Sequence, residues 1–79
     1  MQQVLLALGK RLRELRAERN ISQEAFADLC GLHRTAMSLL ERGKRVPSLR
    51  TLLTLSQGFG IPLSELLEDI DKPVSKRRT

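Results

Sequence analysis

The chain has 79 residues, which suffice for one small domain with a limited core, so oligomerisation would supplement its stability. Its single cysteine excludes an intramolecular disulfide, and the apolar run from Val4 to Leu8 is too short for a signal-peptide core or a membrane span, so we expect a cytoplasmic protein with no membrane partner. Aromatic residues make up 3% of the chain, which argues against recognition of single-stranded nucleic acid by base stacking. The net charge of +5 is weak evidence for any partner, because the four cations of residues 72–79 leave only +1 for residues 1–71.

The first predicted element is an amphipathic helix from Val4 to Arg19. Packing in the core is favoured over a coiled coil, because two heptads are short for a zipper and Asn20 interrupts the pattern. The apolar face recurs at helical spacing and consists of Leu5, Leu8, Leu12 and Leu15. The polar faces are expected to be solvated, and they carry Lys10, Arg11, Arg13 and Arg19, with Glu14 and Glu18 as partners.

A helix-turn-helix is predicted between Ser22 and Glu41. Ser22 is a good N-cap, and Glu24 lies in the first turn, where the helix dipole favours an anion. The first helix therefore begins near Gln23, and Gly31 ends it because glycine readily adopts a left-handed conformation. The inner face of this helix is formed by Phe26, Ala27 and Cys30.

The second helix of the motif follows the turn at Gly31. Leu32 is an apolar residue inside the turn, and we expect it to plug between the two helices. Met37 and Leu40 face inward, and Gly43 ends the helix. The outward face consists of Arg34, Thr35, Ser38 and Leu39, which is not the composition of a core.

Two further helices are predicted after the motif. Pro47 restricts Val46 to extended geometry, and Ser48 caps a helix whose end is marked by Gly58 and Gly60. The inner face of that helix consists of Leu52, Leu55, Ser56 and Phe59, while Leu49 and Leu53 lie elsewhere. After Ile61 and Pro62, a last short helix extends toward Ile70 with its apolar positions at Leu63, Leu66 and Leu67.

The chain is thus predicted to be all-α, with five helices and no strand. Residues 1–70 form the helix-turn-helix domain, with the motif at about 22–42, and residues 71–79 form a basic, flexible tail. Five cations stand against one acid between Arg34 and Arg50, whereas the charged residues of 59–71 are all acidic, namely Glu65, Glu68, Asp69 and Asp71. One side of the domain is therefore suited to phosphate and another is not.

The spacing of several positions resembles the phage-repressor-like (Cro/CI or XRE type) family of DNA-binding helix-turn-helix proteins. The resemblance covers most of the chain and rests on Ser22-Gln23-Glu24, Ala27, Gly31-Leu32, Ser38, Glu41, Gly43 and Pro47-Ser48-Leu49. The segment Leu32-His33-Arg34-Thr35 also resembles the small controller proteins of restriction-modification systems. The family resemblance implies a compact five-helix bundle of the lambda-repressor-like DNA-binding type.

The second motif helix is the predicted recognition helix, because a helix-turn-helix directs the N-terminal residues of its second helix toward base edges in the major groove. Arg34 is the main candidate, since its guanidinium can donate two parallel hydrogen bonds to guanine O6 and N7. Thr35 can offer its hydroxyl or its methyl group, and Ser38 can offer a hydroxyl to a base or a phosphate. Leu39 offers an apolar surface to a thymine methyl group or, alternatively, to a partner protein or solvent.

Phosphate contacts would hold the register without reading sequence. The candidates flank the recognition helix and are Ser22, Gln23, Arg42, Lys44 and Arg45. Gln23 matches a glutamine that clamps the DNA backbone in the resembling family. The same resemblance implies a structural ion pair between Arg16 and Glu41 that ties the first helix to the recognition helix.

His33 and Cys30 are expected to have structural roles. His33 stands where the family commonly has a capping hydroxyl residue, so it is interpreted as a cap or backbone contact. Cys30 is interpreted as a small buried hydrophobe. No metal, cofactor or enzymatic activity is expected, because one His and one Cys provide no metal-ligand spacing and no Ser/His/Asp set, and no glycine loop could cradle a phosphate.

The expected function is that of a sequence-specific regulator that binds double-stranded DNA as a homodimer. One small module makes too few contacts for tight binding, so two copies would read two half-sites. The predicted two-fold interface lies on the acidic side and uses Phe59, Ile61, Leu63, Leu66 and Leu67. The alternative is an antitoxin-like or other protein-interaction module with the same fold, to which Leu39 and the leucine-rich end are suited.

Overall fold

The protein is all-helical, as predicted, in the computed structural model, which describes residues 1–72. Its helices are α1 (Gln2–Glu18), α2 (Gln23–Cys30), α3 (Arg34–Glu41), α4 (Leu49–Phe59) and α5 (Leu63–Leu66). No strand occurs within this described part of the chain. The basic tail predicted at residues 71–79 lies mostly outside it, since Lys76, Arg77 and Arg78 fall beyond residue 72.

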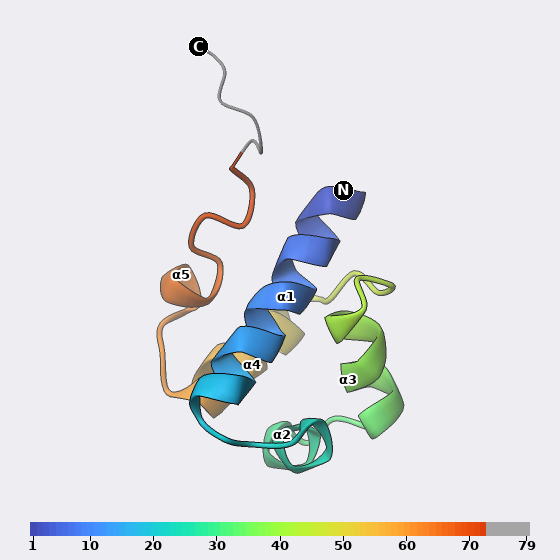
Figure 1. Cartoon of the computed structure of the whole chain (residues 1–79), viewed down its shortest axis with the longest axis vertical. Coiled ribbons are helices and arrows are strands. Elements are labelled where there is room, and N and C mark those ends of the chain that lie inside the picture. The colour runs from blue at the N-terminus through green and yellow to red at the C-terminus, as the bar shows by residue number, and fades with distance from the viewer. Residues whose placement is uncertain (73–79) are drawn as a thin grey trace.

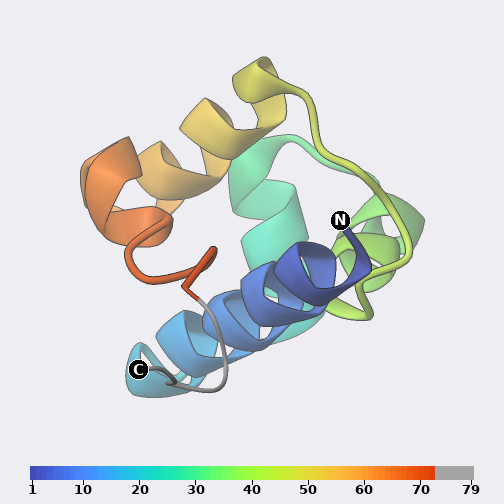
Figure 2. The same cartoon turned by 90° about the horizontal axis from the view of Figure 1, so that it is seen from above.

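The four longer helices surround one core, and α1 runs along the bundle with α3 on one side and α4 behind it (Figure 1). Viewed from above, α1 and α4 lie on opposite sides of the bundle, and the connector from α3 to α4 passes around one end (Figure 2). The predicted inner faces meet in the core, which contains Leu8, Leu12, Leu15, Phe26, Ala27, Met37, Leu40, Leu55, Phe59 and Leu66. Leu32 packs against this core from the turn, as predicted.

A glycine allows α1 to approach the end of α3 closely. A Cβ atom added to Gly9 would lie 2.3 Å from the carbonyl oxygen of Glu41 and 3.0 Å from that of Leu40. Both neighbours are backbone atoms and cannot rotate away. Gly9 therefore sets the distance between α1 and α3.

The contact between α2 and α4 is aromatic. The rings of Phe26 and Phe59 stack with a centroid separation of 4.0 Å and an interplanar angle of 18°. Gly58 lies beside them, where a Cβ would come within 3.0 Å of the Phe26 ring and 2.8 Å of the Cys30 sulfur. The prediction that Gly58 marks the helix end was wrong, because it lies inside α4 and makes room for this contact, and Gly60 alone caps the helix in the left-handed conformation.

The C-terminal helix is shorter than predicted. α5 ends at Leu66, and the following residues form turns in which Asp69 has a φ of 62°, so the helix does not continue to Ile70. Two residues predicted to form a two-fold interface, Phe59 and Leu66, belong to the core of the single chain and are 6% and 0% exposed. That part of the prediction was wrong, because residues already covered within one copy cannot offer a surface to a second.

Candidate nucleic-acid interface

The first motif helix begins where its cap predicts. The Oγ of Ser22 accepts a hydrogen bond of 3.1 Å from the backbone N–H of Ala25, which satisfies one orphan donor of α2. Gly31 ends the helix with a φ of 70°. Since the Ser22 side chain is exposed and its hydroxyl proton is not used by this bond, it remains able to donate to a phosphate.

His33 caps the second motif helix. Its Nδ1 accepts from the backbone N–H of Thr35 at 3.3 Å, so the imidazole takes the place of a capping hydroxyl group. Thr35 itself is exposed, as are His33 and Arg34. The N-terminal turn of α3 therefore projects from the bundle.

The predicted base-contacting residues lie along the outer side of α3. Arg34 and Thr35 are exposed, whereas Ser38 and Leu39, one turn later, are half-buried. Leu39 consequently presents only part of its side chain. The exposed part of this outer side therefore carries the guanidinium of Arg34 and the hydroxyl of Thr35.

Arg34 has an acidic neighbour on α2. Its Nη1 lies 3.9 Å from Oε1 of Glu24, and the two side chains are 68% and 70% exposed. An ion pair this exposed contributes little to folding stability. The pair is notable for its position, because Arg34 is the main candidate for a base contact.

Cations continue beyond the end of α3. Arg42, Lys44 and Arg45 are all exposed in the connector that leads to α4. Gly43 turns the chain there with a φ of 70° and packs against Leu6 of α1, where a Cβ would come within 2.9 Å of the leucine side chain. The connector is thus fixed against the body while its cations face solvent.

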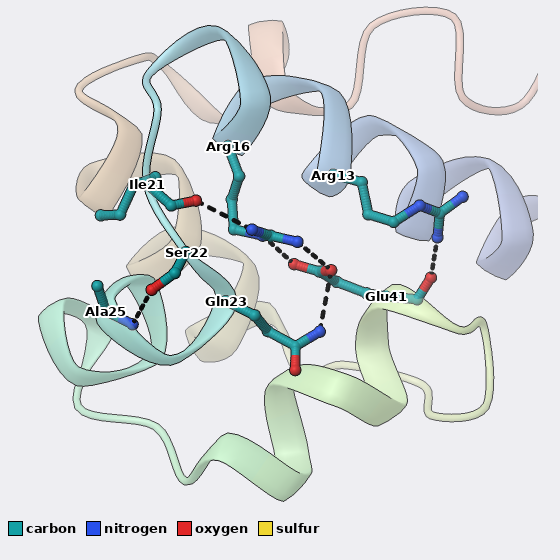
Figure 3. A network of polar contacts seen from close by, with 7 residues as sticks. All are labelled: Arg13, Arg16, Ile21, Ser22, Gln23, Ala25 and Glu41. Carbon is teal, nitrogen blue, oxygen red and sulfur yellow. Dashed lines mark hydrogen bonds and ion pairs between the residues drawn. The ribbon is translucent and has the colours of Figure 1, made fainter.

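A buried carboxylate holds the three N-terminal helices together. Glu41 on α3 is 2% exposed, and its two oxygens accept from Nε and Nη2 of Arg16 on α1 at 2.6 and 2.9 Å. Arg16 also donates to the carbonyl of Ile21 at 2.9 Å. Figure 3 shows Arg16, Gln23 and Glu41 converging from different helices. Hydrogen bonding to Glu41 raises the pKa of the Arg16 guanidinium, which therefore stays charged.

Gln23 takes part in this network as well as standing on the predicted phosphate-contacting surface. Its Nε2 donates to Oε1 of Glu41 at 3.1 Å, while Figure 3 shows its amide oxygen turned away from the carboxylate. Sequence reasoning placed Gln23 only among the phosphate contacts. The half-buried Gln23 side chain also connects the start of α2 with the end of α3 through this hydrogen bond.

Besides Arg16, three further arginines on or next to α1 bind backbone carbonyls, which the sequence analysis missed. Arg13 donates to the carbonyl of Glu41, and Arg11 donates to those of Glu65 and Leu66. Arg19 donates to the carbonyl of Phe59 at 3.3 Å and lies 5.1 Å from the centroid of its ring. One signal was available for Arg13, since it lies four residues after Gly9 and a glycine inside a helix often marks a close approach.

Cys30 packs half-buried against the core, and its Sγ lies 4.0 Å from the carbonyl oxygen of Thr54. Burial raises the pKa of its thiol.

Among residues 1–72, no cluster of three His, Cys, Asp or Glu residues could hold a metal ion, and no helix is long and apolar enough to cross a membrane.

Comparisons with known proteins agree with this arrangement. A family model described as "Helix-turn-helix" matches residues 12–66. The control protein C.MunI of a Mycoplasma species is 45% identical over 73 residues, which span 91% of this chain and 99% of that protein. The transcriptional regulator PuuR of Escherichia coli (strain K12) is 41% identical over 68 residues, 86% of this chain but 37% of PuuR.

A solved structure is similar in both fold and sequence. The restriction-modification controller protein C.AhdI from Aeromonas hydrophila superposes with a TM-score of 0.76 and 44% identity, over 78% of this chain and 94% of C.AhdI. The chain therefore belongs to the helix-turn-helix family of DNA-binding transcriptional regulators.

Proposed function

We propose that the protein binds a specific double-stranded DNA site as a homodimer, with α3 of each copy in the major groove. The observation that carries the proposal is the exposed N-terminal turn of α3, where Arg34 and Thr35 project from a helix that is fixed at its other end by the buried Glu41. A rigid helix with free side chains at its N-terminal end suits base readout. The proposed role is binding without catalysis, and it places the protein in the cytoplasm.

Arg34 would donate two hydrogen bonds to guanine O6 and N7, the strongest base contact that this surface can offer. Thr35 and Ser38 would add hydroxyl contacts, and the exposed part of Leu39 would contact a thymine methyl group. Because Ser38 and Leu39 are half-buried, they would offer less surface to the bases than Arg34 does.

Phosphates would be contacted on both sides of α3. Lys44 and Arg45 in the connector and Arg42 at the helix end supply cations, and Ser22 supplies its hydroxyl proton. Gln23 would contribute through the part of its amide that Glu41 does not use. Each phosphate neutralised by a cation steepens the dependence of log K on log salt by about 0.9.

The dimer would use apolar surface that one copy leaves uncovered. Ile61, Leu63 and Leu67 are half-buried and remain available, unlike Phe59 and Leu66. The exposed face of α4 adds Leu49 and Leu53, which are four residues apart and 70% and 46% exposed. Leu53→Glu should therefore give a monomer in sedimentation, while Leu29→Glu, at an exposed leucine of α2, serves as the matched control. A dimer that survives Leu53→Glu would exclude this interface.

We further propose that the regulated genes belong to a restriction-modification system. The support is that the matched region spans 99% of C.MunI and 94% of C.AhdI, whereas it spans 37% of PuuR. The sequence similarity is thus to small controller-type proteins over nearly their whole length. A selected binding site upstream of restriction or methyltransferase genes in the source genome would bear the proposal out, and one found only elsewhere would contradict it.

The direct test is selection of binding sites from a random duplex library at physiological salt, with wild type, Arg34→Ala and Lys10→Ala in parallel. Lys10 is an exposed cation of α1, so its removal matches the charge change without touching α3. We expect an inverted repeat from wild type and Lys10→Ala, and loss of one guanine preference from Arg34→Ala. The spacing of its half-sites should be about one helical turn or a multiple of it.

Two results would overturn the proposal. If Arg34→Ala selects the same repeat with the same guanine, Arg34 is not the base reader. If wild type selects no motif, the fold acts as an antitoxin-like or other protein-interaction module, for which the half-buried Leu39 and the exposed leucines of α4 would be the contact surface.

A further inference from the structure

We propose that Glu24 is a specificity-determining residue, which acts by holding the Arg34 guanidinium so that random phosphates compete poorly for it. The inference rests on the proposed function, because it concerns how Arg34 distinguishes guanine from backbone. It gives a role to the acid that lies beside Arg34.

The geometry joins the two residues across the motif. Glu24 is the second residue of α2 and Arg34 the first of α3, and their charged atoms, Oε1 and Nη1, are 3.9 Å apart. Both side chains are about 70% exposed, so neither is fixed by packing. The neighbours of the guanidinium are therefore the carboxylate and water.

A carboxylate on this surface opposes non-specific binding. DNA phosphates attract cations irrespective of sequence, and this term supplies essentially all non-specific affinity. A phosphate that approaches Arg34 also approaches the negative Glu24 carboxylate and is repelled by it, whereas guanine O6 and N7 are neutral acceptors. Glu24 thus offsets the charge of one cation in the non-specific interaction.

Guanine recognition does not require the pair to break. A guanidinium has five N–H donors in a planar fork, and the bidentate contact with guanine O6 and N7 uses two of them. The remaining donors can still face Glu24. The carboxylate therefore disfavours the contact of Arg34 with phosphate more than its contact with guanine, which raises the ratio of specific to non-specific affinity.

The experiment measures affinity for the selected site and for a scrambled duplex of equal length, by fluorescence anisotropy across a salt series. Wild type is compared with Glu24→Gln and with Glu68→Gln, an exposed acid near the C-terminal end of the described chain that changes net charge equally. Both substitutions are also made in the Arg34→Ala background. Thermal unfolding of every variant checks that the fold is retained.

We expect Glu24→Gln to raise non-specific affinity about three- to five-fold, the size of an exposed ion pair, and to lower the specificity ratio accordingly. Its non-specific salt slope should steepen by about 0.9, because Arg34 then neutralises one phosphate. In the Arg34→Ala background, the effect of Glu24→Gln on non-specific affinity should be smaller than in wild type, because only the repulsion between the carboxylate and the phosphates remains to be removed.

Either of two outcomes overturns the inference. One is that Glu24→Gln and Glu68→Gln change non-specific affinity equally, and the other is that the effect of Glu24→Gln persists undiminished without Arg34. Failure of the proposed function is distinguishable, because it would leave no selected site or a guanine preference that Arg34→Ala retains.

Discussion

Replacing the buried Glu41 tests what holds α3 in place against α1 and α2. Glu41→Ala removes the acceptor of two hydrogen bonds from Arg16 and one from Gln23. The Arg16 side chain is only 17% exposed, so its guanidinium would keep the carbonyl of Ile21 and otherwise lose its protein partners in this network. The substitution therefore leaves an uncompensated charge as well as a cavity.

Breaking a buried pair by removing one partner costs about 3–5 kcal/mol, and the partial exposure of Arg16 places this case at the lower end, at about 3 kcal/mol. The free energy of unfolding of a small domain is about 5–15 kcal/mol, so this loss is a large part of its total stability. For a chain of this size it corresponds to a decrease in Tm of roughly 12–24 °C. Arg16→Met combined with Glu41→Leu should recover most of this, since an apolar pair needs no charge compensation.

Urea unfolding at 25 °C, followed by far-UV circular dichroism, measures the change, with Arg34→Ala as the matched loss of an exposed pair. The Glu41→Ala loss should be nearly the same at 0.1 and 0.5 M salt, because buried charges are weakly screened. A loss below about 1 kcal/mol would place the pair with ordinary surface pairs and refute this reasoning.

Two further predictions concern packing and the thiol. Gly9→Ala should destabilise the fold by about 1–3 kcal/mol, because its Cβ would meet the immovable carbonyl oxygens of Leu40 and Glu41, and urea unfolding that matches wild type would contradict this. Cys30 should react with iodoacetamide more slowly in the native protein than in 6 M urea at pH 8, since burial raises its thiol pKa. Equal alkylation rates in the two states would exclude this protection. The contribution of the thiol to folding stability should be fully present below its pKa in the unfolded chain and should be lost as pH rises through the raised pKa of the native state.

Helix boundaries were largely predictable because their chemistry is local. Ser22 and Ser48 cap α2 and α4 through their own hydroxyls, and Gly31 and Gly60 end those helices in the left-handed conformation. These assignments need only the residue and its neighbours along the chain. The same holds for the apolar face of each helix, which follows from its period.

Contacts between distant segments were not predictable in this way. Periodicity places Phe59 and Leu66 on apolar helix faces, but it does not show whether the same chain or a second copy covers them. In the structure both side chains are buried in the core of the single chain. Gly58 resembled a helix end, yet its missing side chain serves the Phe26 ring on another helix. Arg11 and Arg13 bind carbonyls that are distant in sequence, and a carbonyl leaves no mark in the side-chain pattern.

We propose that Arg34 on α3 reads a guanine in the major groove. Replacing that guanine in the selected site with 7-deazaguanine removes the N7 acceptor and leaves Watson–Crick pairing intact. Wild type should lose about ten-fold in affinity, within the range of a bidentate base contact, while Arg34→Ala should lose nothing further. Equal losses for both proteins, or no loss for wild type, would contradict the claim.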